Sequence, residues 1–133
     1  MRYSPVLLAG LIALSGACRP VDPEKTTRAV EWLEHYYKKE KFPAVKGGTG
    51  FVAFKVKADG HELQVYVWTP VWEHARMLRG MDISQKVRYW ELIACPPRGA
   101  AIWTIKDKNQ YLTVELRGPT TFDEDFIVNV ICK

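Results

Sequence analysis

The three histidines of this 133-residue chain are the first residues to consider for catalysis or metal binding. His35, His61 and His74 are far apart in the sequence, and none has a second ligand at the spacing typical of a zinc site. No Cys-x-x-Cys pair accompanies them. We therefore expect no metal site and no cofactor, and we expect these histidines to be solvated or to lie at the edge of the core.

Nucleophiles for catalysis are also scarce. No Gly-x-Ser-x-Gly motif occurs, and Ser84 is the only serine after residue 18. Glu34 and Glu91 could act as a carboxylate pair, but the sequence does not determine the distance between them. We therefore predict no catalytic residue, and an enzyme is the less favoured interpretation.

The third reactive side chain is cysteine, which occurs at positions 18, 95 and 132. Cys18 follows an N-terminal segment with one positive charge at Arg2, an apolar run over residues 6–14 and small residues at 15–17. This order is typical of a secretory signal peptide, and the apolar run is too short to span a bilayer. We predict that residues 1–17 are removed and that the mature chain begins at Cys18.

The small residues directly before Cys18 resemble the lipobox of bacterial lipoproteins, although Ser15 stands where that motif usually has leucine. The resemblance implies that Cys18 carries a diacylglycerol and holds the protein at a membrane. It also implies the outer membrane facing the periplasm, because Arg19 is not the aspartate that favours inner-membrane retention. Plain secretion into the periplasm or medium is the alternative.

An odd cysteine count in an exported protein leaves one cysteine unpaired. If Cys18 carries the lipid, Cys95 and Cys132 form an even pair in an oxidising compartment. We therefore predict a disulfide between Cys95 and Cys132.

Two short motifs resemble ligand-binding loops only in part. The glycine-rich residues 46–50 lack the length and the Lys-Ser/Thr ending of a phosphate-binding loop, so we interpret them as a turn. Asp123, Glu124 and Asp125 form an acidic cluster without the oxygen-rich repeat of a calcium loop. We interpret this cluster as a solvated loop before an edge strand.

Aromatic residues are the strongest sign of a binding surface. The chain has five tryptophans and six tyrosines, and two of these tryptophans flank a proline-containing turn. Tryptophans in loops are common in protein interfaces, and a second loop at residues 96–99 carries an arginine. The candidate binding residues are therefore Trp68, Trp72 and Arg98.

The charge distribution excludes one class of partner. The formal net charge is +4, from 19 basic and 15 acidic residues that are interspersed along the chain. Because no long basic block occurs, nucleic acid is not an expected partner. The expected partners are a membrane, through the N-terminal lipid, and a protein of unknown identity.

Helix and hairpin signals organise the first half of the mature chain. Asp22-Pro23-Glu24 resembles a helix start, and apolar residues at helical spacing predict a helix over residues 23–40. Residues 51–56 and 63–68 alternate with period two around Asp59-Gly60, which predicts a β-hairpin. Thr69-Pro70 and Gly80 indicate a short second helix near residues 70–79.

The second half is read mainly as strands. Residues 85–95 fit either of two elements. A helix would align Ile83, Val87, Trp90 and Ala94 on one face. We favour a strand, because β-branched and aromatic side chains are frequent in this segment. A second hairpin is predicted from residues 101–106 and 111–116, and Gly118-Pro119 ends it. A final strand is predicted over residues 126–132.

These elements predict an α+β domain. We expect one N-terminal helix packed on a curved antiparallel sheet of about five to six strands. Residues 18–21 would be a short tether and residues 22–133 a single globular domain. The outline resembles cystatin-like rolls, but no motif of that family accompanies it, so the resemblance implies no function.

The combination of export, small size and no convergent catalytic set favours a binding module. We expect a small lipid-anchored envelope protein that acts as an inhibitor or accessory subunit. A small envelope hydrolase and a structural subunit of a secretion or surface assembly are the alternatives.

Overall fold

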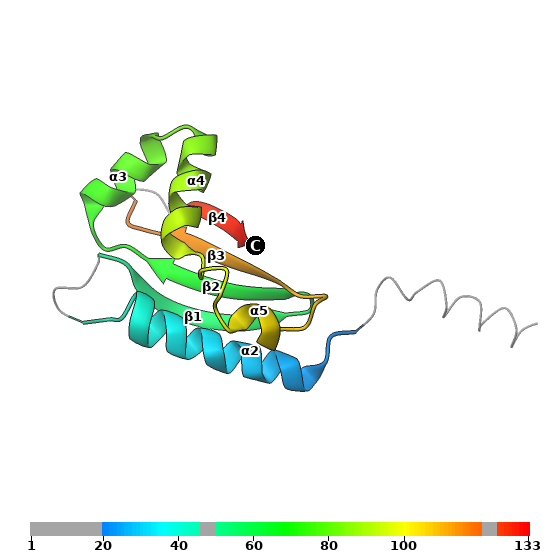
Figure 1. The fold of residues 1–133 in the computed structure, drawn as a ribbon. Coiled ribbons are helices and arrows are strands. Elements are labelled where there is room, and N and C mark those ends of the chain that lie inside the picture. Colours follow the sequence, from blue (N-terminus) through cyan, green and yellow to red (C-terminus); the bar gives the residue numbers. More distant parts are fainter. Residues whose placement is uncertain (1–19, 46–49, 121–124) are drawn as a thin grey trace, which may run out of the picture.

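The computed structural model describes residues 20–45, 50–120 and 125–133, and the fold is α+β (Figure 1). The leader, Cys18, residues 46–49, Asp123 and Glu124 lie outside the described residues. In chain order the elements are α2 (Pro23–His35), the π-helix η2 (Tyr36–Lys41), β1 (Val52–Asp59), β2 (Glu62–Trp68), α3 (Trp72–Gly80), α4 (Ile83–Ala94), α5 (Ile102–Ile105), β3 (Tyr111–Arg117) and β4 (Phe126–Cys132).

The predicted N-terminal helix is confirmed. The Asp22 carboxylate accepts a hydrogen bond from the Glu24 N–H at 3.0 Å and so caps the helix start. Ala29 and Leu33 are buried against the sheet, and α2 continues into η2 without a break. The helix lies along the β1 side of the sheet (Figure 1).

The predicted first hairpin is also confirmed. β1 and β2 pair antiparallel from Val52–Trp68 to Asp59–Glu62. Gly60 in the turn has a φ of +60°, a conformation that glycine adopts without steric cost. The predicted short helix is present as α3.

The strand predicted over residues 85–95 is wrong, because this segment is helix α4. The Asp82 carboxylate accepts hydrogen bonds from the Ser84 and Gln85 N–H groups and caps the helix start. Trp90 and Ala94 are fully buried, whereas Leu92 is 79% exposed. The helical alignment therefore fits the burial of Trp90 and Ala94, although Ile83 is 76% exposed. The β-branched and aromatic side chains made the segment resemble a strand.

The second predicted hairpin is wrong as well. Residues 102–105 form helix α5, and β3 pairs with β2 in parallel, in register from Glu62–Tyr111 to Trp68–Arg117. The sheet of the described residues is mixed and has four strands in the order β1-β2-β3-β4, not five or six antiparallel strands. A parallel pair needs a long crossover, which α3, α4 and α5 provide.

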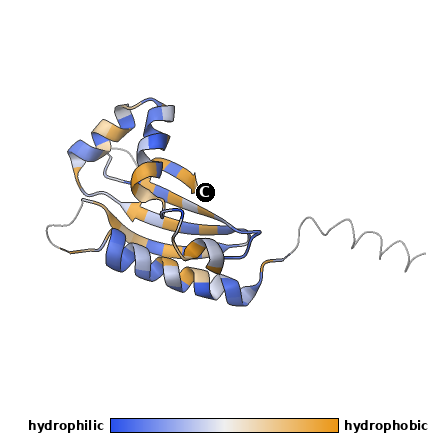
Figure 2. Ribbon diagram, in the orientation of Figure 1, coloured by the Kyte–Doolittle hydropathy of each residue, from blue (hydrophilic) through white to orange (hydrophobic). Residues whose placement is uncertain are grey.

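The core lies between the helices and one face of the sheet. Val65, Val114 and Val130 are paired neighbours across β2, β3 and β4, and all three are buried. The Trp90 indole N–H donates to the Val114 carbonyl at 3.1 Å. Figure 2 shows hydrophobic residues along the strands and hydrophilic residues on the outer side of α2.

A disulfide joins Cys95 to Cys132, as the cysteine count predicted. Cys95 follows the last residue of α4, and Cys132 ends β4. The bond therefore fixes the C-terminal strand to the helix that packs over it.

Candidate binding site at one end of the sheet

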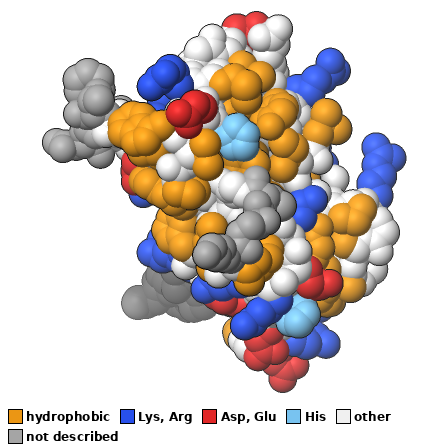
Figure 3. Space-filling view, turned by 90° about the vertical axis from the view of Figure 1, so that its left-hand side faces the viewer, with side chains coloured by type: hydrophobic (Ala, Val, Ile, Leu, Met, Phe, Trp, Pro, Cys, Tyr) orange, Lys and Arg blue, Asp and Glu red, His pale blue; other side chains and the backbone are white. Residues whose placement is uncertain are grey.

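Exposed apolar side chains gather at one end of the sheet. The end is defined by the cross-strand row Val52, Trp68, Arg117 and Phe126. Figure 3 views the molecule from this side and shows hydrophobic side chains over much of the surface. The exposed large apolar residues of this row and of the adjoining β1 and α3 segments are Phe54, Val71, Trp72, Met77 and Phe126.

A groove of about 460 Å³ opens at this end. Most of its wall is apolar, with two charged side chains at one side. The lining residues are Val52, Phe54, Trp68, Pro70, Arg117 and Asp125. The groove therefore contains Trp68, one of the candidate residues from the sequence, and combines an apolar wall with a charged one.

A β-bulge brings Phe54 to the groove. The register shifts between Ala53 and Lys55, so Phe54 is the extra residue of β1. Both Phe54 and Lys55 are exposed, whereas Ala53 and Val56 are buried. Strict alternation would have turned Lys55 toward the core, and the bulge removes this conflict.

Arg117 is held rigidly at the side of the groove. Its Nε donates to the Glu115 carboxylate at 2.5 Å, and its guanidinium lies 3.6 Å from the Asp125 carboxylate. It also lies 5.2 Å from the ring centroid of Tyr66. The hydrogen bond that Arg117 donates to the Glu115 carboxylate raises the pKa of Arg117, so this side chain is a permanent cation.

Tyr66 extends the site onto the open face of the sheet. The Lys55 and Lys57 ammonium groups lie 5.7 Å and 6.0 Å from its ring centroid. Phe54 lies 6.0 Å from the same ring. A ligand in the groove would therefore meet aromatic rings with basic groups beside them.

A second, smaller depression of about 260 Å³ lies beside helix α3. It is lined by Trp72, Arg76, Arg79 and Thr120. Val71, between the groove residue Pro70 and Trp72, is exposed. The two depressions are therefore adjacent along the chain.

Arg98, the third candidate residue, lies elsewhere. It lines a shallow depression with Trp103 and Lys133, near the disulfide and the end of β4 where the chain terminates. The groove is at the start of β4. The structure therefore brings Trp68 and Trp72 to one end of the molecule and places Arg98 apart from them.

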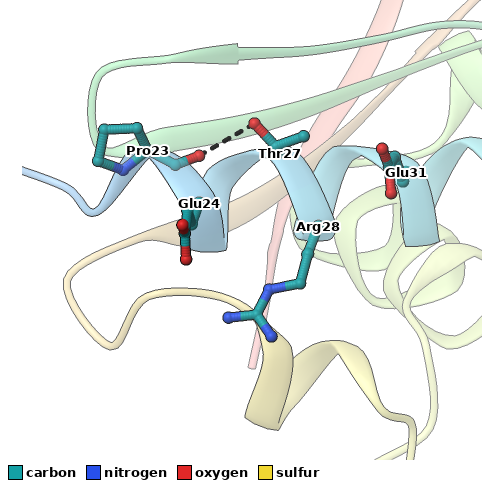
Figure 4. A pocket seen from close by; sticks show the side chains of 5 residues that line it. All are labelled: Pro23, Glu24, Thr27, Arg28 and Glu31. Atoms are coloured by element: carbon teal, nitrogen blue, oxygen red, sulfur yellow. Dashed lines mark hydrogen bonds between the residues drawn. The ribbon is translucent and has the colours of Figure 1, made fainter.

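A further depression follows helix α2 but makes a poor candidate site. All five residues that line it come from this helix, and Figure 4 shows them along one side of it: Pro23, Glu24, Thr27, Arg28 and Glu31. The one hydrogen bond drawn there runs from the Thr27 hydroxyl to the Pro23 carbonyl within the helix. Because residues of several elements do not converge here, we do not assign it a ligand.

The histidines lie apart, each in its own environment. His35 faces Glu40 on the surface, His61 hydrogen-bonds the Asn109 carbonyl, and His74 stacks on Phe51. The Nδ1 atom of His74 is buried, and no described residue forms a hydrogen bond with it. No three His, Cys, Asp or Glu side chains within the described part of the chain are close enough together to hold a metal ion.

The other candidate catalytic groups have structural contacts. The Ser84 hydroxyl donates to the Asp82 carboxylate at 2.8 Å, as part of the cap of α4. Glu34 forms an ion pair with Lys38 at 3.0 Å. The Asp82 carboxylate also accepts from the Ser84 and Gln85 N–H groups, so the Ser84 hydroxyl belongs to an exposed helix cap.

Sequence reasoning missed Phe54, Tyr66, Arg117, Arg76 and Arg79 as site residues. Alternation in β1 and β2 did place Phe54 and Tyr66 on strand faces, but it did not show which face of the sheet was open. The position of Arg117 beside Trp68 depends on the parallel register of β2 and β3, for which the sequence contains no local signal.

None of the helices in the described residues is both long and apolar enough to cross a membrane. No known protein family matches the sequence, and no curated protein matches it significantly. The fold is similar to the crystal structure of a Pseudomonas aeruginosa protein inferred to be secreted. The TM-score is 0.51 at 13% sequence identity, over 83% of this chain and 93% of that chain. At this identity the similarity shows the fold alone.

Proposed function

We propose that this protein is a small exported envelope protein that acts as a binding or accessory module and uses the groove as its binding site. The observation that carries the proposal is the groove itself. Two aromatic side chains, Phe54 and Trp68, line an open apolar surface beside the immobilised cation of Arg117. Aromatic and arginine side chains are enriched in the central contacts of protein interfaces.

Three observations support export. The first 17 residues have the order of a signal peptide, and Cys95 and Cys132 are joined by a disulfide. The Pseudomonas aeruginosa protein of similar fold is inferred to be secreted. Together they support an oxidising compartment for the folded domain.

The lipid anchor at Cys18 is the finer part of the proposal. Cys95 and Cys132 are already paired, so Cys18 is left without an intramolecular partner. The lipobox-like residues before it and Arg19 after it support attachment to the outer membrane, facing the periplasm. The anchor would keep the binding module close to its site of action.

Site-specific photo-cross-linking tests the binding function. A benzoylphenylalanine at position 54 should form a cross-link to an envelope protein in intact cells, because Phe54 lines the groove. Tyr111 is the matched control, since it is 44% exposed against 45% for Phe54 and lies at the other end of the sheet. The same amino acid at position 111 should not form that product.

Three results would contradict the proposal. Irradiation could give no product at position 54, or the same products at positions 54 and 111. A product consisting of two copies of this chain would instead favour a structural subunit over a binding module.

A further inference from the structure

We propose that the depression formed by Trp72, Arg76, Arg79 and Thr120 binds a carboxylate that stands next to an apolar side chain, in an acidic segment of a protein partner. The inference deepens the proposed binding function and rests on it. It names the chemistry of the partner at a surface adjacent to the groove.

Arg79 supplies a cation that is fixed in place by backbone carbonyls, with no acidic partner among the described residues. Its guanidinium donates to the backbone carbonyls of Pro119, Gly118 and Asp125, at 2.5, 3.1 and 3.3 Å. Arginine has five N–H donors, so these three bonds leave two for a ligand. The carbonyls orient the side chain, and no ion pair within the described ranges neutralises its positive charge.

Arg76 adds a second cation on the same helix. It is exposed, and neither Arg76 nor Arg79 has an ion-pair partner within the described part of the chain. Residues three apart on a helix are neighbours, and two like charges there repel each other. A bound anion would relieve this repulsion, and guanidinium groups match the two oxygens of a carboxylate.

Trp72 determines what must accompany the carboxylate. It precedes Arg76 by four residues, so its side chain lies on the same side of α3. The indole is 44% exposed and lines the depression with the arginines. An apolar side chain beside the carboxylate would cover this ring.

The size and position of the depression favour a protein segment over a free small molecule. About 260 Å³ of open space is below the range of pockets that enclose a small ligand. Pro70 lines the groove and Trp72 lines this depression, with the exposed Val71 between them. A partner segment could therefore contact both depressions at once.

A titration with two peptides tests the inference on the folded mature domain. The probes are the acetylated and amidated tetrapeptide Gly-Phe-Asp-Gly and its counterpart with Asn in place of Asp. Backbone amide NMR shifts should move saturably in α3 and at Gly118 and Thr120 with the Asp peptide. The Asn peptide should bind at least fivefold more weakly, since it lacks the charge.

Variant Arg76→Gln should weaken binding of the Asp peptide at least fivefold, and 0.5 M salt should weaken it in the wild type. Arg88→Gln is the matched control, because Arg88 is also an exposed helical arginine without an ion pair in the described residues. It should leave the affinity unchanged. Circular dichroism would show that both variants fold.

Equal binding of the Asp and Asn peptides, equal affinity of wild type and Arg76→Gln, or no saturable shifts in α3 would overturn the inference. These outcomes are separate from the test of the proposed function. A specific cross-link from position 54 together with a negative titration would leave the binding function standing and remove only the carboxylate site.

Discussion

Tyr37 is a single residue that joins two helices through the core. Its side chain is fully buried, and its hydroxyl donates to the Ala94 carbonyl at 2.6 Å. Ala94 is the last residue of α4, so this bond satisfies a carbonyl that has no partner within its own helix. Burial, with a smaller contribution from Tyr36, raises the pKa of Tyr37 well above its ordinary value.

We predict that Tyr37→Phe lowers the free energy of unfolding at pH 7 by about 1–2 kcal/mol, since a buried carbonyl loses its donor. In the wild type, stability should also fall above about pH 10, where the unfolded tyrosine ionises and the folded one does not. Tyr37→Phe should remove that part of the fall. Urea unfolding at pH 7 and at pH 10.5 measures both effects.

The control for this prediction is Tyr111→Phe, because Tyr111 is 44% exposed. Its effect at pH 7 should stay within about 0.5 kcal/mol. Equal stability of Tyr37→Phe and wild type at pH 7, or the same loss from both variants, would show that the buried hydroxyl does not stabilise the fold.

Among the elements, α4 and β4 are the two that a disulfide joins. α4 packs over β4, and the Cys95–Cys132 disulfide closes a separation of 37 residues between their ends. β4 is an edge strand of the described sheet, held on one side by β3. The disulfide therefore secures a strand that has one hydrogen-bonded neighbour.

We predict that the double variant Cys95→Ser, Cys132→Ser loses about 3–4 kcal/mol in the free energy of unfolding, since the open chain gains conformational freedom when unfolded. Urea unfolding of the domain from residue 20 onward measures the loss. Wild-type protein under reducing conditions should show a similar loss. Unchanged stability in the variant, or free thiols in protein from an oxidising compartment, would contradict the prediction.

In the whole molecule, the start of α2 and the groove lie at opposite ends. α2 begins at the right-hand end of the molecule in Figure 1, and the groove lies at the other end, where β2 and β3 terminate. α2 has 13 residues and η2 has six. At a helical rise of 1.5 Å per residue, the two helices together extend over about 28 Å. Residues 19–21 would add a tether of about 10 Å. A lipid at Cys18 would therefore leave the groove facing away from the membrane.

We predict that Cys18→Ser moves the protein from the membrane fraction to the soluble fraction and leaves its thermal unfolding midpoint unchanged. One acyl chain anchors a protein only marginally, so the modification must supply more than one chain to hold it. Intact mass of the wild-type protein measures the modification directly. A mature chain that begins at an unmodified Cys18 would mean plain secretion.

The sequence by itself determined the features that depend on local signals. The Asp22 cap and the helical apolar spacing predicted the N-terminal helix, and Asp59-Gly60 predicted the first hairpin. Cysteine counting predicted the Cys95–Cys132 pair. The helix and hairpin signals lie within a few neighbouring residues, and the disulfide follows from the number of cysteines. None of them depends on how the elements pack.

Only the tertiary structure decided the second half of the fold. Residues 85–94 have apolar side chains that fit both a strand and a helix, and burial of Trp90 against the sheet favoured the helix. Because α4 and α5 then form a crossover, β3 pairs with β2 in parallel. Strand pairing between distant segments depends on packing energy that no local pattern contains.

The candidate site divides in the same way. The sequence identified Trp68 and Trp72 through a proline-containing turn with aromatic residues on both sides. Phe54 reached the groove through a bulge, and Arg117 through the parallel register of β2 and β3. Arg76 and Arg79 adjoin it because α3 packs against the connection between β3 and β4. Which side chains meet at the end of a sheet is determined by strand register and helix packing, and these form only when the whole domain folds.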